Sequence, residues 1–204
     1  MSTPTSLSPA VGASAGVPVR WYASRWTQLV VGIVCMIATA NIQYAWTLFV
    51  PEIQKSFGWE RASIQIAFTI FVLVQTWLAP IEGYFIDKFG PRLIVAFGAV
   101  FIGAAWVINS QATTLLGFYI GAAVGGIGVG SIYATCINDA LKWFPDRRGL
   151  AVGLTAGGYG AGSAATILPI AAMIESSGFQ EAFFFFGVMQ GSLAFLAAWF
   201  LRAP

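Results

Sequence analysis

Residues 93–138 read LIVAFGAVFIGAAWVINSQATTLLGFYIGAAVGGIGVGSIYATCIN, and none of these side chains is charged. A bilayer core about 30 Å thick needs about 20 apolar residues per crossing helix, so the stretch is long enough for two. Its centre, Asn109–Thr114, is polar and short, which is typical of a turn. The stretch therefore predicts two membrane-spanning helices joined by a turn.

The rest of the chain extends this pattern. Four further uncharged intervals each have the length of one span: 26–51, 62–81, 149–174 and 182–201. Hydrophobic residues make up 58% of the 204 positions and charged residues only 9%, whereas soluble domains carry about a quarter as charged residues. The sequence thus predicts an all-α integral membrane protein with six transmembrane helices.

The chain divides into a tail and one domain. Residues 1–25 are rich in Ser, Thr, Pro, Ala and Gly, which predicts a disordered cytoplasmic tail. Residues 26–204 form the six-helix transmembrane domain. Ala38-Thr39-Ala40 is similar to a signal-peptide cleavage site, but the apolar run continues to Val50, too far for a signal peptide.

The basic residues indicate an orientation. Eight of the ten fall on one side of the predicted topology, and only Lys55 and Arg61 fall on the other. Cytoplasmic loops carry the excess of Lys and Arg, so both termini are predicted in the cytoplasm of a multi-pass cell (inner) membrane protein. The eight are Arg20, Arg25, Lys88, Arg92, Lys142, Arg147, Arg148 and Arg202.

Several functional classes are disfavoured by composition. The chain has no histidine, which excludes a histidine metal site and a Ser/His triad, and its two cysteines lie far apart inside spans. Glu82 and Asp139 are expected at cytoplasmic helix ends, so the membrane region offers no paired carboxylates for an intramembrane enzyme. We expect no enzyme, no cofactor and no nucleic-acid partner.

Glycines recur every four residues in the fourth and fifth spans. Helices in lipid associate where small residues let their backbones approach. These rows predict static packing or dimerisation, or smooth surfaces that slide during transport. The rows are Gly117, Gly121 and Gly125; Gly126 and Gly130; Gly149, Gly153 and Gly157; and Gly158 with Gly162.

Polar side chains within three spans predict a cavity without fixed charge, because lipid-facing positions should be apolar. The alternative is that they form structural hydrogen bonds between helices. One face carries Thr39, Gln43, Trp46 and Thr47, with Tyr44 at its edge. The others carry Ser131, Thr135 and Asn138, with Tyr133 turned away, and Thr155, Tyr159, Gly162, Ser163 and Thr166.

The loop between the second and third spans, GYFIDKFGPR at residues 83–92, resembles the signature of the major facilitator superfamily, Gly-x-x-x-Asp-(Arg/Lys)-x-Gly-(Arg/Lys)-(Arg/Lys). It departs at Pro91, where the family has a base. Gly90 suits a tight turn, and Asp87 could accept hydrogen bonds from a helix N-terminus. The resemblance implies a gating latch made by Gly83, Asp87, Lys88, Gly90 and Arg92; an ordinary charged turn is the alternative.

A narrower resemblance follows. KWFPDRRGLAVGL at residues 142–154, and Gln43-Tyr44-x-Trp46-Thr47 in the first span, are similar to the oxalate/formate antiporter subfamily. The resemblance implies that Gln43, Tyr44 and Trp46 contact a small carboxylate substrate, and that Tyr133 and Tyr159 close around it. Ala122 stands where drug/proton antiporters have an arginine, which disfavours that activity.

No Lys or Arg lies within a predicted span, although a desolvated carboxylate is costly without a cation. The resemblance implies that the cation comes from a second six-helix half, either the missing C-terminal half or a second copy. This chain would then be the N-terminal half of a twelve-helix transporter, built of two inverted three-helix repeats in the lipid bilayer.

The function expected from this resemblance is exchange of small organic anions, such as oxalate and formate, by alternating access. The chain by itself would be incomplete for this activity. Two alternatives remain: a monocarboxylate carrier of the same superfamily, and a non-transporting truncated half or assembly partner.

Overall fold

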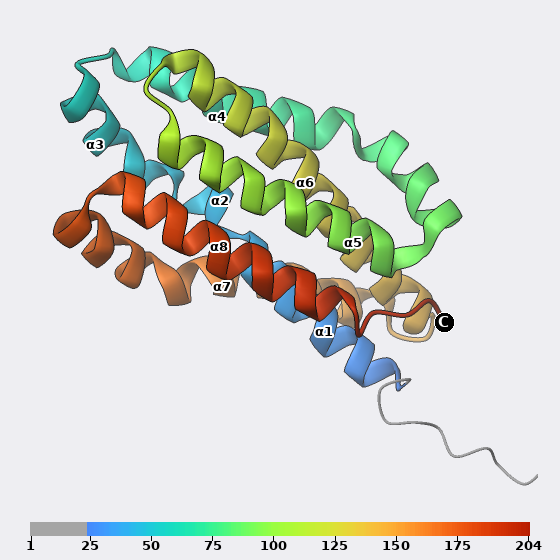
Figure 1. Ribbon diagram of the computed structural model, residues 1–204. Coiled ribbons are helices and arrows are strands. Elements are labelled where there is room, and N and C mark those ends of the chain that lie inside the picture. Colours follow the sequence, from blue (N-terminus) through green and yellow to red (C-terminus); the bar gives the residue numbers. More distant parts are fainter. Residues whose placement is uncertain (1–23) are drawn as a thin grey trace, which may run out of the picture.

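The computed structural model describes residues 24–204, and all of their regular structure is helical. The long helices lie side by side in one bundle (Figure 1). The predicted tail falls outside the described residues except for its last two positions. The helices are α1 Arg25–Thr39, α2 Asn41–Tyr44, α3 Trp46–Phe57, α4 Arg61–Trp77, α5 Ala79–Gln111, α6 Leu115–Trp143, α7 Arg148–Ser177 and α8 Phe179–Ala198.

These eight helices make six crossings. The first, Arg25–Phe57, comprises α1, α2 and α3. Gly90 divides α5, because its φ of 77° and ψ of 168° are not helical. The second crossing is therefore α4 with residues 79–89, and the third is residues 91–111. With α6, α7 and α8 the predicted all-α bundle of six membrane helices is confirmed.

The first crossing is irregular near its middle. Helical structure is interrupted at Ala40 and again at Ala45. The backbone N–H groups of Gln43 and Tyr44 both donate to the Ala40 carbonyl, at 3.3 and 3.1 Å. Pro51 lies inside α3 and lacks a backbone donor. Ala40 and Ala45 both keep right-handed helical φ and ψ, so the three helices continue one another as one crossing.

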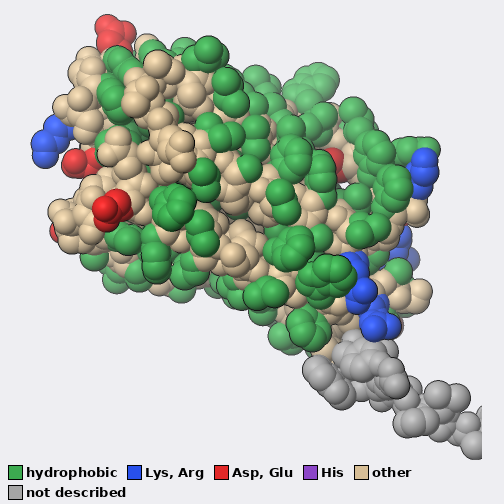
Figure 2. All heavy atoms as spheres, in the orientation of Figure 1, with side chains coloured by type: hydrophobic (Ala, Val, Ile, Leu, Met, Phe, Trp, Pro, Cys, Tyr) green, Lys and Arg blue, Asp and Glu red, His purple; other side chains and the backbone are tan. Residues whose placement is uncertain are grey.

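The two ends of the bundle differ in charge. Figure 2 shows most of the visible basic side chains at one end and most of the acidic ones at the other, with a hydrophobic band between them. The basic end contains the ion pairs Lys142–Asp87 and Arg25–Asp146, at 3.0 and 3.1 Å. A hydrophobic band between charged ends is what a multi-pass membrane protein requires.

The glycines of α6 pack against neighbouring backbones. A Cβ added to Gly128 would lie 2.8 Å from the Gly98 carbonyl oxygen on α5. One added to Gly126 would lie 2.7 Å from the Phe71 carbonyl oxygen on α4. The predicted close approach of helices is therefore confirmed for α6, and it holds α4, α5 and α6 together.

The glycines of α7 divide into two sets. Gly158 and Gly162 face α1, where an added Cβ would meet Ile33 and Ile37. The open glycine row, Gly149, Gly153 and Gly157, has no atom within 4 Å of an added Cβ among the described residues. The six helices leave this second set uncovered.

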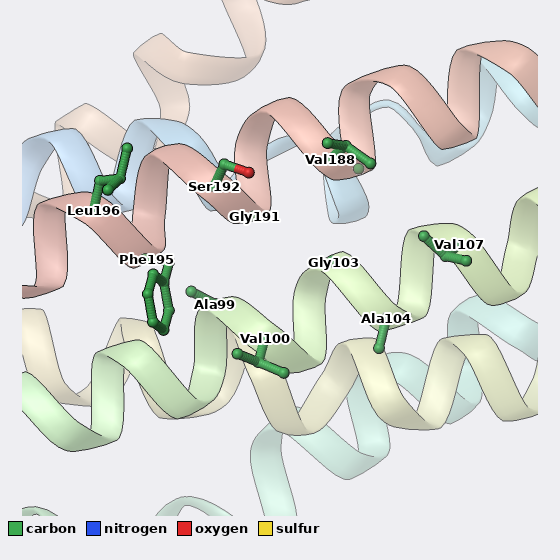
Figure 3. Close-up of a pocket in the computed structure, with 11 residues that line it drawn as sticks. Ala99, Val100, Gly103, Ala104, Val107, Val188, Gly191, Ser192, Phe195 and Leu196 are labelled. Atoms are coloured by element: carbon green, nitrogen blue, oxygen red, sulfur yellow. The ribbon is translucent and has the colours of Figure 1, made fainter.

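A hollow of about 670 Å³ lies between α5 and α8 (Figure 3). The two helices approach closely at Gly103 and Gly191, where a Cβ added to Gly191 would lie 3.1 Å from the Gly103 Cα. Ser192 is the one hydroxyl among its lining side chains, and the others are hydrocarbon or aromatic. This hollow suits lipid chains and offers little to an anion.

Gly90→Ala should destabilise the chain by about 1–3 kcal/mol, because the Gly90 conformation is essentially restricted to glycine. The measurement is unfolding of the purified chain by SDS in mixed micelles. Gly83→Ala is the matched control, since an added Cβ meets nothing within 4 Å there and the backbone is helical. Equal stability of both variants would contradict the expectation.

Candidate functional site

Four polar side chains meet at the middle of the bundle and are named here the tyrosine cluster: Gln43, Tyr44, Tyr133 and Tyr159. The Tyr159 hydroxyl donates to Oε1 of Gln43 at 2.8 Å. The Tyr44 and Tyr133 rings lie 5.4 and 5.5 Å from the Tyr159 ring, centroid to centroid. Tyr159 is thus the centre of a group drawn from α2, α6 and α7.

The cluster lies deep in the membrane span. At a rise of about 1.5 Å per residue, Tyr133 and Tyr159 are each roughly 15 Å along their helices from the basic end. That is near the middle of a hydrocarbon core about 30 Å thick. Tyr159 is buried, whereas Tyr44 is 45% exposed, so one side of the cluster is open.

Three hydrogen-bond donors of the cluster are unengaged. Within residues 24–204, no partner is found for the Gln43 amide nitrogen or for the hydroxyls of Tyr44 and Tyr133. A carboxylate can accept several such bonds, and bonds to ionised groups are the stronger ones. The cluster can therefore hold an anion through neutral donors, although none of its four side chains is a Lys or Arg.

Trp46 does not join the tyrosine cluster, although the sequence predicted that it shares a face with Gln43. Its Nε1 donates to Oε1 of Gln65 on α4 at 3.1 Å, and its ring contacts Phe118 edge-on. The side chain is 6% exposed and lies inside the bundle. The Trp46 side chain is therefore directed toward α4, and the structure does not bring it to the cluster.

Two members of the predicted polar stripe of α6, Ser131 and Thr135, also lie outside the tyrosine cluster. Ser131 and Thr135 are buried, and they donate to Glu82 and to the Ser131 carbonyl, respectively. The prediction that this stripe lines the cavity is wrong for both. Tyr133 is turned away from them, as its position on the helix predicted, and that is the side on which it contacts Tyr159.

The hydroxyls of Thr39 and Thr155 do not form the predicted bonds between helices. Thr39 donates to the Met36 carbonyl and Thr155 to the Ala151 carbonyl, each within its own helix. Asn41 was missed by the sequence reasoning: its Oδ1 accepts a hydrogen bond from the Thr166 hydroxyl at 2.8 Å, which joins α2 to α7, the helices of Gln43 and Tyr159. The sequence signal that could have identified Asn41 is an amide side chain inside the first predicted span, two positions before Gln43.

The loop residues form contacts at the basic end. Asp87 pairs with Lys142 of α6, in place of the expected helix N-terminus. Arg92 donates to the Trp199 carbonyl and stacks over its ring at 5.4 Å. Lys88 lies over the Phe89 ring at 5.4 Å.

The segment after α8 is held at the same end. Gln28 of α1 donates to the Phe200 carbonyl at 3.0 Å and accepts from the Arg202 backbone at 2.9 Å. Trp143 of α6 donates to the Arg202 carbonyl at 3.0 Å. Together with Arg92, these bonds join α1, α5 and α6 to residues 199–202.

One carboxylate departs from its expected position. Glu82 and Asp139 were both predicted at cytoplasmic helix ends, and each is only 6% exposed. Asp139 does lie in the last turns of α6, which ends at Trp143. Glu82 lies about 12 Å along its helix from Gly90, inside the membrane span. Residues 24–204 hold no group of three potential metal ligands.

The comparison with known families addresses these features. Residues 31–204 match the family model described as Major Facilitator Superfamily. The chain belongs to the major facilitator superfamily. The loop at residues 83–92, which resembles the signature of this family, lies within the matched residues.

Individual relatives refine the comparison. The chain is 35% identical over 197 residues to the oxalate:formate antiporter of Oxalobacter formigenes, covering 97% of this chain and 46% of that protein. It is 25% identical over 181 residues to the probable sulfoacetate transporter SauU of Cupriavidus necator, covering 85% and 41%. It is 24% identical over 140 residues to human monocarboxylate transporter 11, covering 68% and 30%. The resemblance to the oxalate/formate antiporters is confirmed, and this superfamily chain spans less than half the length of these relatives.

Proposed function

We propose that this chain forms one half of a secondary transporter that exchanges small organic anions of the oxalate and formate type. The observation that carries the proposal is the tyrosine cluster, with three unengaged neutral donors at mid-span. The similarity to an antiporter named for oxalate and formate supports the choice of substrate. Gln43, Tyr44, Tyr133 and Tyr159 are the proposed substrate contacts.

The lack of a cation in the tyrosine cluster supports the presence of a second half of the transporter. A bare carboxylate is costly to desolvate, and the cluster provides no cation. The open glycine row of α7, and Gly83 of α5, leave surfaces where another helix could approach closely. The partner is either the remaining half of a longer chain or a second copy. Rocking of the two halves would expose the site alternately to each side.

The orientation supports a cytoplasmic latch. By the positive-inside rule the basic end faces the cytoplasm. Asp87, Lys88 and Arg92 lie at that end, and their contacts with α6 and the segment after α8 suit a latch that closes the cytoplasmic side. Gly83 and Gly90 would shape it.

The test is counterflow in proteoliposomes. Vesicles loaded with formate receive the chain alone or with the C-terminal half of the Oxalobacter antiporter, and uptake of labelled oxalate is measured after co-purification verifies the pairing. We expect formate-driven uptake with the pair. Uptake by the chain alone would assign the second half to a second copy. No counterflow of any organic anion by the verified pair would contradict the proposal.

A monocarboxylate carrier is the second candidate, supported by the similarity to monocarboxylate transporter 11. The same vesicles distinguish it. Counterflow of labelled lactate without that of oxalate would assign the monocarboxylate activity.

Asp87→Asn should slow exchange several-fold while changing stability by less than about 1 kcal/mol, because its pair with Lys142 is exposed. Asp146→Asn is the matched control, since it breaks the Arg25 pair of similar length and exposure at the same end. Counterflow rates and SDS unfolding are measured together. Equal rates for the two variants would contradict a special role for Asp87.

A further inference from the structure

The membrane span holds a carboxylate that the anion site does not use. Glu82 is 94% buried, and its Oε1 accepts a hydrogen bond from the Ser131 hydroxyl at 3.3 Å. Its Oε2 is buried without a hydrogen-bond partner in the described part of the chain. No ion pair there includes Glu82. A buried carboxylate oxygen without a donor is costly, so the site is chemically incomplete.

Two neighbouring residues of α6 accommodate the Glu82 carboxylate. A Cβ added to Gly130 would lie 2.7 and 2.9 Å from the two carboxylate oxygens, so the glycine makes the space for them. The neighbouring Ser131 supplies the one donor. The Glu82 side chain therefore occupies a recess formed by Gly130 and Ser131.

Glu82 and Ser131 are the polar lining of a cavity of about 460 Å³, within the size range of small-molecule pockets. The other walls are hydrocarbon and aromatic, and Phe85, Phe89 and Phe97 are partly exposed. Figure 2 shows one acidic side chain among the hydrophobic side chains of the band. The remaining wall residues are Leu78, Ile81, Leu93, Ile94 and Ile127.

We infer that this Glu82 pocket binds a protonated primary amine carried on an apolar body. The ammonium group donates to Oε2 and neutralises the carboxylate, and aromatic faces favour a nearby cation. The hydrocarbon body fills the apolar walls. The nearby basic side chains are engaged elsewhere: Lys142 with Asp87, and Arg92 with Trp199. The ligand enters from the outer side of α5, because the wall residues Ile81, Phe85 and Phe97 are exposed there.

This site is distinct from the tyrosine cluster and takes a ligand of opposite charge, so it stands or falls independently of the proposed anion exchange. The experiment uses the purified chain in a neutral maltoside detergent, and octylammonium is titrated by calorimetry. Octanol and octyltrimethylammonium are the comparison probes, because neither combines a positive charge with an N–H donor. We expect octylammonium to bind at least about tenfold more tightly than either.

Glu82→Gln should weaken octylammonium binding at least about tenfold, since the amide can still accept from Ser131 but carries no charge. Glu181→Gln, an exposed acid at the opposite end, should leave the dissociation constant unchanged. Ile94→Trp should also weaken binding, because it fills the pocket and leaves Glu82 in place. Unchanged binding by Glu82→Gln, or equal binding of octanol and octylammonium, would overturn the inference.

A second measurement needs no variant. A hydrophobic diazo compound esterifies buried carboxyl groups without coupling them to amines, and peptide mass spectrometry reports esterification at Glu82. Octylammonium should protect Glu82 and octanol should not; equal protection would overturn the inference. Reconstitution in phosphatidylcholine with or without phosphatidylethanolamine then separates the sources. Protection by the aminolipid assigns a lipid headgroup, and its absence assigns a free amphiphilic amine.

Discussion

Tyr159→Phe should lower oxalate–formate counterflow about tenfold in vesicles that hold this chain and a complementary half. The substitution keeps both ring contacts but removes the hydroxyl that donates to Gln43. A buried polar group left without its partner costs about 1–3 kcal/mol, which corresponds to roughly five- to 150-fold. Tyr159→Ala, which also removes the ring, should lower counterflow more than about 100-fold.

Tyr119→Phe is the matched control for this prediction. The Tyr119 hydroxyl donates to the Ser63 carbonyl at 2.8 Å, outside the tyrosine cluster. The same chemical change there should leave counterflow within about twofold. If Tyr159→Phe and Gln43→Ala both transport at the wild-type rate, the Gln43–Tyr159 bond is structural and the proposed substrate site is wrong.

Gly128→Val should destabilise the chain by about 3 kcal/mol. The new side chain would have to displace the backbone of α5, since an added Cβ already lies 2.8 Å from the Gly98 carbonyl oxygen and 2.9 Å from the Ile102 nitrogen. Overpacking of this kind costs about 1–3 kcal/mol and occasionally more. SDS unfolding in mixed micelles, followed by circular dichroism, measures the change.

Gly157→Val in α7 is the control for packing. It makes the same chemical change in a helix interior, but an added Cβ there meets nothing within 4 Å. Helix propensity favours valine over glycine by a few tenths of a kcal/mol, so stability should change by less than about 0.5 kcal/mol. Similar losses for Gly128→Val and Gly157→Val would show that close approach between α5 and α6 is not what stabilises the bundle.

The bundle could be predicted from the sequence because charge is costly in hydrocarbon. That rule assigns each uncharged interval to the membrane. The polar centre of residues 93–138 separated its two helices correctly, since α5 ends at Gln111 and α6 begins at Leu115. Gly90 was identified as a turn from its place in the loop, and its positive φ agrees. The same rule misplaced Glu82, because a preference for charges at helix ends does not anticipate a recess formed by Gly130.

The candidate site could be predicted only in part. Resemblance selected Gln43, Tyr44, Tyr133 and Tyr159, and the structure brings these four together. Periodicity alone indicates which residues share a face, but not which neighbour that face meets. The α6 stripe therefore proved to face the bundle interior.

Trp46 shows a further limit of periodicity. A helical wheel places Trp46 on the face of Gln43, but it does not show that α4 meets that face at Trp46, where Nε1 donates to Gln65. The spacing of glycines is likewise not enough to predict which helix faces are packed. Identical intervals in α6 and α7 correspond to packed contacts in one helix and open surface in the other.

The bonds around residues 199–202 have a mechanical consequence. Gln28, Arg92 and Trp143 join three helices to the segment that leaves the fourth, all at one end. None of these helices can tilt by itself without breaking a bond there. A displacement at one helix is therefore passed to the others, and α1, α5, α6 and α8 should move together as one rigid unit at this end of the bundle.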